Sequence, residues 1–121
     1  MAVQDVKVIS VPVSDQERAK AFYVDTLGLE LERDDHSVPG IRWIQVAPRG
    51  GTTSLTLVNW FDAMPPGSLQ GLVVGTTDLE RDCHELAARG VDFERPLRQQ
   101  PWGAEAVVRD PDGNQIVLQQ A

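Results

Sequence analysis

The chain has 121 residues, 41% of them hydrophobic and 24% charged, as is typical of one globular domain. The formal net charge of −7 and the absence of a Lys/Arg stripe exclude nucleic acid as an expected partner. No apolar run reaches the roughly 18 residues of a membrane span. Asp5 and Lys7 interrupt the apolar stretch that a signal peptide would need. Cys83 has no second cysteine to pair with. We therefore expect a cytoplasmic protein without a membrane partner.

Along the chain, a strand, a helix and three more strands are predicted twice. In the first module, about residues 1–58, the strands fall at 6–13, 29–33, 41–47 and 54–58. A linker at about 59–68 follows. In the second module, about residues 69–121, the strands fall at 71–75, 92–94, 105–109 and 115–119.

Each predicted helix begins with a capping box, in which a hydroxyl and a carboxylate satisfy the first free amides of the helix. The first box is Ser14 with Glu17, and the second is Thr77 with Glu80. Apolar residues then recur at helical spacing along one face.

The two helical segments are copies of one another. Three residues recur 63 positions later, namely Asp15, Glu17 and Arg18 as Asp78, Glu80 and Arg81. Gly28 recurs as Gly90 with one residue deleted, and both stand where a left-handed helix C-cap favours glycine. A four-stranded sheet with one helix leaves its other face bare, so we expect an α+β fold in which two tandem βαβββ modules form a curved mixed sheet around a cleft.

Short segments mark both modules: Val13-Ser-Asp, Ala21-Phe-Tyr, Leu27-Gly, and Asp110-Pro-Asp-Gly-Asn114 after Pro101-Trp-Gly103. These segments resemble the glyoxalase/bleomycin-resistance/dioxygenase family, also called the vicinal-oxygen-chelate superfamily. The resemblance covers nearly the whole chain and implies the paired-module fold. It leaves function open, because the family includes lyases, isomerases, dioxygenases, thiol transferases and drug-sequestering proteins.

The resemblance also implies four strand positions at which metal enzymes of the family hold a divalent ion. Those positions are occupied here by Val8, Thr56, Gly71 and Val117. A metal site needs several nitrogen or oxygen donors, which this set lacks. We therefore expect no metal and no cofactor, as in the antibiotic-binding branch of the family.

Other residues offer little chemistry. His36 is predicted in a loop, His84 on the exposed side of the second helix, and Cys83 on its apolar face. Glu105 is the only carboxylate at a predicted cleft position, where it is a candidate ligand anchor or general base. No catalytic residue is assigned.

Strand alternation and loop composition select the side chains expected to line the cleft. Aromatic residues in Pro/Gly-rich loops suggest a platform for a flat ligand. The candidate ligand-binding residues are Val8, Ser10, Trp43, Gln45, Thr56, Trp60, Phe61, Gly71, Val73, Trp102, Glu105, Val117 and Gln119.

The favoured function is metal-independent binding of a hydrophobic or planar small molecule, such as an antibiotic, by a homodimer. The first alternative is a metal-free lyase or isomerase that uses Glu105 or His36. The second is a regulatory or structural subunit with a vestigial cleft. The sequence leaves open whether the modules pair within one chain or swap across a dimer.

Overall fold

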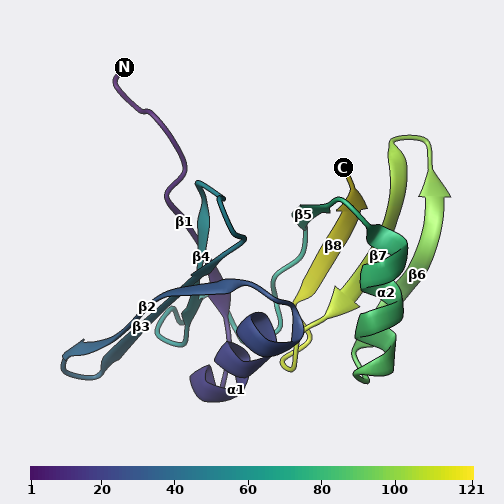
Figure 1. The fold of residues 1–121 in the computed structure, drawn as a ribbon. Coiled ribbons are helices and arrows are strands. Elements are labelled where there is room, and N and C mark those ends of the chain that lie inside the picture. The colour runs from purple at the N-terminus through teal and green to yellow at the C-terminus, as the bar shows by residue number, and fades with distance from the viewer. The chain divides into compact units, whose positions relative to one another are not determined.

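The computed structural model describes residues 1–121 and has the predicted α+β fold, with two four-stranded sheets and no closed barrel (Figure 1). The chain divides into unit 1, Met1–Pro66, and unit 2, Gly67–Ala121. No helix is both long and apolar enough to cross a bilayer.

Unit 1 contains one complete βαβββ module. Its sheet has the order β1-β4-β3-β2, with β1 parallel to β4 and the other pairs antiparallel. A short helix continues into a π-helical turn, η1, before the second strand. The elements are β1 (Val8–Pro12), α1 (Gln16–Ala21), η1 (Phe22–Thr26), β2 (Glu30–Val38), β3 (Ile41–Ala47) and β4 (Ser54–Val58).

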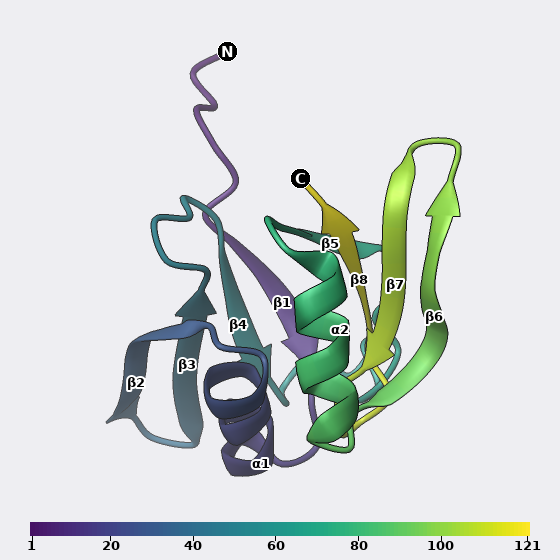
Figure 2. The ribbon, with the colours of Figure 1, turned by 45° about the vertical axis from the view of Figure 1, so that its right-hand side comes forward.

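Unit 2 repeats this arrangement, with the order β5-β8-β7-β6 and β5 parallel to β8 (Figures 1 and 2). The matching strand orders confirm the duplication inferred from the sequence. The elements are β5 (Leu72–Thr76), α2 (Leu79–Ala88), β6 (Asp92–Gln100), β7 (Gly103–Arg109) and β8 (Gln115–Gln120).

Both helices begin one residue later than the capping boxes predicted. Asp15 is the N-cap of α1, and its Oδ1 accepts a hydrogen bond from the Arg18 amide at 3.0 Å. Asp78 caps α2 in the same way through the Arg81 amide at 3.1 Å. An aspartate carboxylate three residues before that amide satisfies it directly, so the preceding hydroxyl residue is not needed as the cap.

Each sheet buries one face beneath its helix. In unit 1, α1 packs on β4, and Ala19, Phe22, Tyr23, Ile44 and Val46 are all buried. In unit 2, α2 packs on β6, β7 and β8 over a core made by Leu79, Leu86, Ala106, Val108, Ile116 and Leu118. We call the opposite side of each sheet its open face. Residues of opposite parity along the strands point to it.

Candidate ligand-binding site

Three aromatic rings lie together on unit 1, two of them stacked and the third tilted against them, and we call this group the aromatic stack. Trp43 lies on β3, while Trp60 and Phe61 follow β4. The ring centroids of Trp43 and Trp60 are 6.3 Å apart and the ring planes are inclined by 25°. The ring centroid of Phe61 lies 6.0 Å from that of Trp60. Trp43 and Trp60 are only half-buried, and Phe61 is exposed. A partly exposed aromatic stack is a surface on which a flat ring can pack.

A chain of hydrogen bonds fixes the polar groups beside Trp43. The indole Nε1 of Trp43 donates to Gln45 Oε1 at 3.0 Å, and Gln45 Nε2 donates to Glu32 Oε1 at 3.1 Å. The Ser54 hydroxyl donates to the same Glu32 oxygen. The Ser54 bond, and then the Gln45 bond, lower the pKa of Glu32 below its usual value, so the carboxylate stays charged at neutral pH.

Sequence reasoning missed Glu32, which reaches the open face through a β-bulge. Leu31 pairs with Val46, yet Arg33 pairs with Gln45, so one extra residue is inserted in β2. Glu32 and Arg33 therefore both lie opposite Gln45. The sequence around Glu32 is polar throughout and shows no alternation of apolar and polar residues. The only signal for its position was its hydrogen-bonding partner Gln45, which was predicted to lie on the open face.

A cavity of about 200 Å³ adjoins the stack on the same face. Trp43 contributes to its wall, and an ion pair of 2.9 Å between Arg33 and Asp35 forms its polar edge. Val38 and Ile41 complete the lining. This volume is below the usual range for drug-sized ligands, so the cavity suits one ring or substituent of a larger molecule.

The remaining predicted residues of unit 1 lie on β1 and β4. Val8 pairs with Ser54 and Ser10 with Thr56, with the two hydroxyls of the second pair 3.3 Å apart. Thr56 is fully buried. Its hydroxyl is thus already bonded within the sheet and presents little surface to a ligand.

On unit 2, the open face is centred on Glu105 of β7. This residue is only 6% exposed; its Oε2 accepts a hydrogen bond from Trp102 Nε1 at 3.0 Å, and Arg95 lies 3.7 Å from Oε1. Trp102 itself is 64% exposed in the turn between β6 and β7. Gln119 of β8 is the register partner of Glu105 on β7. These groups form a second, more polar surface.

Val73 and Val117 pair across β5 and β8, and the Val73 side chain is half exposed. Gly71 lies just before β5 with a φ of +87°, so its backbone itself favours glycine. A Cβ built at Gly71 would meet nothing within 4 Å, which agrees with the expectation of open space there.

The four positions implied for a metal do not fit one. Val8, Gly71 and Val117 have no donor atom in their side chains, and the Thr56 hydroxyl is bonded to Ser10. No group of three or more His, Cys, Asp or Glu side chains is arranged to hold an ion. The chemistry of this donor set is therefore unsuited to a divalent cation.

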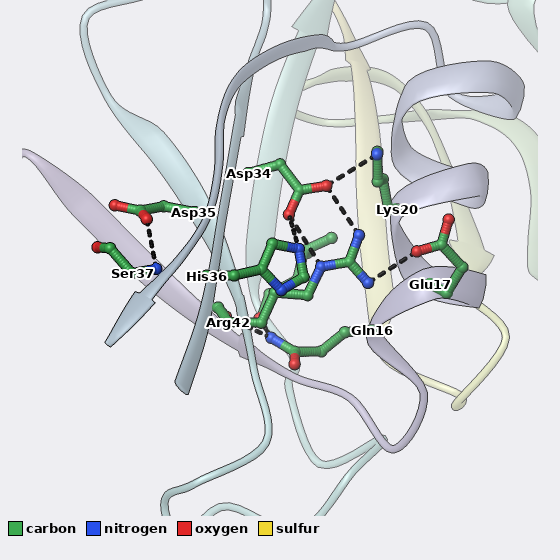
Figure 3. A network of polar contacts seen from close by, with 9 residues as sticks. Gln16, Glu17, Lys20, Asp34, Asp35, His36, Ser37 and Arg42 are labelled. Atoms are coloured by element: carbon green, nitrogen blue, oxygen red, sulfur yellow. Dashed lines mark hydrogen bonds and ion pairs between the residues drawn. The ribbon is translucent and has the colours of Figure 1, made fainter. Parts of the chain in front are cut away.

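His36 lies in β2, not in a loop as predicted, because this edge strand continues through the polar run to Val38. Its Nε2 is 3.4 Å from Asp34 Oδ1, on the side of the sheet that α1 covers (Figure 3). Asp34 also accepts two hydrogen bonds from Arg42, at 2.7 and 2.8 Å, and one from Lys20 at 2.8 Å. His36 thus belongs to the helix side of unit 1 and does not reach its open face.

This network fastens α1 to the sheet. Arg42 also pairs with Glu17 of α1 at 2.7 Å, and Gln16 donates to the carbonyl oxygen of Arg42 at 2.7 Å (Figure 3). The Arg42 and Lys20 bonds hold the pKa of Asp34 far below its usual range. The cluster therefore stays ionised and acts as a structural anchor.

The α2 residues considered for chemistry also lie away from the open face. His84 is exposed on α2. Cys83 is half-buried, and burial, with a smaller contribution from Asp82, raises the pKa of its thiol. A protonated thiol is a poor nucleophile, so Cys83 is unsuited to nucleophilic chemistry.

Comparison with known proteins identifies relatives over nearly the whole chain. The family model described as Glyoxalase/Bleomycin resistance protein/Dioxygenase superfamily matches residues 6–118. TnmS3, an antibiotic binding protein from Streptomyces sp. CB03234, is 53% identical with a TM-score of 0.94, over 99% of this chain and 98% of that one. A glyoxalase/bleomycin resistance protein from the same organism is 52% identical with a TM-score of 0.87, over 96% and 100%. YetH of Bacillus subtilis is 29% identical over 98% of this chain and 99% of its own.

Proposed function

Because the chain belongs to the Glyoxalase/Bleomycin resistance protein/Dioxygenase superfamily, and because its open faces present aromatic rings and few metal donors, we propose that it binds a planar, hydrophobic small molecule without a metal. The observation that carries this proposal is the Trp43, Trp60 and Phe61 stack beside fixed polar groups. The similarity to TnmS3 favours an antibiotic or related natural product as the ligand. Such a protein protects by lowering the free drug concentration and needs no turnover.

A second candidate function is a metal-free lyase or isomerase reaction. It is favoured by the buried carboxylate of Glu105 on the open face of unit 2. A general base must reach the proton that it removes. Here one carboxylate oxygen accepts from Trp102 and the other faces Arg95, an arrangement better suited to anchoring a ligand than to taking a proton.

The experiment is a fluorescence titration with anthraquinone as a planar aromatic probe. We expect saturable quenching of tryptophan emission, because two of the three tryptophans lie in the stack. Addition of EDTA should change neither the quenching nor the melting temperature. Absence of saturable quenching would contradict binding, and an EDTA-sensitive melting temperature would contradict metal independence. Chromatography of the mixture tests turnover, since a product formed beyond one equivalent would favour the enzyme.

We also propose that the protein is a cytoplasmic homodimer. Large apolar side chains are exposed on the sheets and turns, Val73, Phe61 and Trp102 among them, and a dimer would cover part of this apolar surface. One half-buried free thiol, Cys83, suits a reducing compartment. Sedimentation at roughly tens of micromolar is expected to show a dimer as the main species, in keeping with interfaces of ordinary size. A monomer under those conditions would contradict the assembly.

A further inference from the structure

The two sheets carry the same β-bulge at equivalent positions. In unit 1 the register shifts between Leu31 and Arg33, and in unit 2 it shifts between Phe93 and Arg95. The extra residue is a glutamate in both cases, Glu32 in the first bulge and Glu94 in the second. The duplication therefore provides an internal comparison for the surroundings of Glu32.

Glu94 is paired with a cation of its own sheet. Its carboxylate forms an ion pair with Arg109 of β7, which also binds Asp92 at 2.8 Å. Asp92 and Arg109 are partners in the register of the sheet. In this cluster Glu94 is therefore bound by a cation that the protein itself supplies.

Glu32 has lost the corresponding cation. Glu30 pairs with Ala47 in unit 1 as Asp92 pairs with Arg109 in unit 2, so Ala47 stands where the arginine would be. The neighbouring Arg33 is paired with Asp35 at 2.9 Å.

The hydrogen-bonding partners of Glu32 are the uncharged Gln45 and Ser54, and both donate to Oε1. The second carboxylate oxygen, Oε2, has no partner within the protein. Glu32 is exposed on the open face, where Gln45 links it to the Trp43 indole.

We propose that the open face of unit 1 selects a planar aromatic cation that carries an amino group. The ring packs on Trp43, and the amino N–H donates to Glu32 Oε2. A charge-assisted hydrogen bond is stronger than a neutral one, and an indole face also attracts a cation. The inference rests on the proposed function and adds the charge of the ligand to it.

The test compares two probes of similar ring size, proflavine, which is a planar cation at neutral pH, and the neutral acridone. We expect proflavine to bind the wild-type protein more tightly than acridone. Glu32→Gln should weaken proflavine about tenfold and change acridone less than about twofold, because a charge-assisted contact is lost. The glutamine still offers an acceptor to Gln45 and Ser54, so the geometry is kept. Calorimetry or fluorescence titration measures both affinities.

The matched control is Glu94→Gln in the equivalent bulge, which should leave both affinities unchanged because Glu94 is already paired with Arg109. Added salt should weaken proflavine binding to the wild type and have little effect on acridone. If both probes bind but Glu32→Gln affects them equally, the inference is wrong and the proposed function stands. Binding of neither probe to a folded wild-type protein would overturn both.

Discussion

Trp43→Ala is expected to weaken the binding of a planar aromatic compound by about tenfold or more. Truncation removes the ring that stacks on Trp60 and the indole N–H that holds Gln45. A stacked aromatic contact contributes roughly 0.5–1.5 kcal/mol beyond burial, and loss of an aromatic anchor can cost about 2 kcal/mol or more. About 1.4 kcal/mol corresponds to a factor of ten in affinity. A fluorescence or calorimetric titration with anthraquinone measures the change.

The conservative variant Trp43→Phe separates the two contributions of this side chain. It keeps an aromatic ring against Trp60 and loses only the donor to Gln45, so we expect a smaller loss of affinity than for alanine. Unchanged affinity in Trp43→Ala, with a melting temperature close to that of the wild type, would show that the stack is not part of the binding site.

Trp102→Ala provides a second comparison in unit 2. Because Trp102 is 64% exposed, its removal should leave folding intact while it frees the Glu105 oxygen and weakens ligand binding. Unfolding of this variant, with unchanged affinity in the remaining folded fraction, would assign Trp102 to the core instead.

Regular alternation made the central strands predictable. The bounds of β3, Ile41–Ala47, and of β4, Ser54–Val58, are those expected from the sequence, because these strands bury apolar residues beneath a helix. The edge strands β2 and β6 are longer than predicted. They are paired on one side only and contain bulges, so polar residues occupy them without a period of two.

The same physical cause limited the prediction of the site. Trp43 and Gln45 could be placed opposite Ile44 by alternation along one strand. Glu32 could not, because a bulge changes which face a residue occupies and its position depends on pairing with β3. The position of His36 was wrong for a related reason, since a polar run in an edge strand resembles a loop.

Asp110→Ala is expected to destabilise the protein by about 3 kcal/mol. Asp110 is buried, and its Oδ1 accepts hydrogen bonds from the amides of Asp112 and Asn114, both at 2.9 Å. Its Oδ2 accepts another from Asn114 Nδ2 at 2.8 Å. Alanine would leave these donors without their acceptor, and each unsatisfied buried group costs roughly 1–3 kcal/mol.

The consequence extends beyond the turn between β7 and β8. Asn114 Oδ1 accepts from the Leu69 amide at 3.0 Å, and the Gln115 amide donates to the Leu69 carbonyl at 2.9 Å, which ties the segment before β5 to β8. Loss of Asp110 releases Asn114 and therefore weakens this tie as well. Urea denaturation should show the decrease in the free energy of unfolding, while Asp62→Ala, an aspartate exposed in unit 1, should change it by less than about 0.5 kcal/mol. The expected loss is large, because the free energy of unfolding of a whole domain is typically only about 5–15 kcal/mol. Equal stabilities of the two variants would mean that the buried carboxylate contributes nothing to the stability of unit 2.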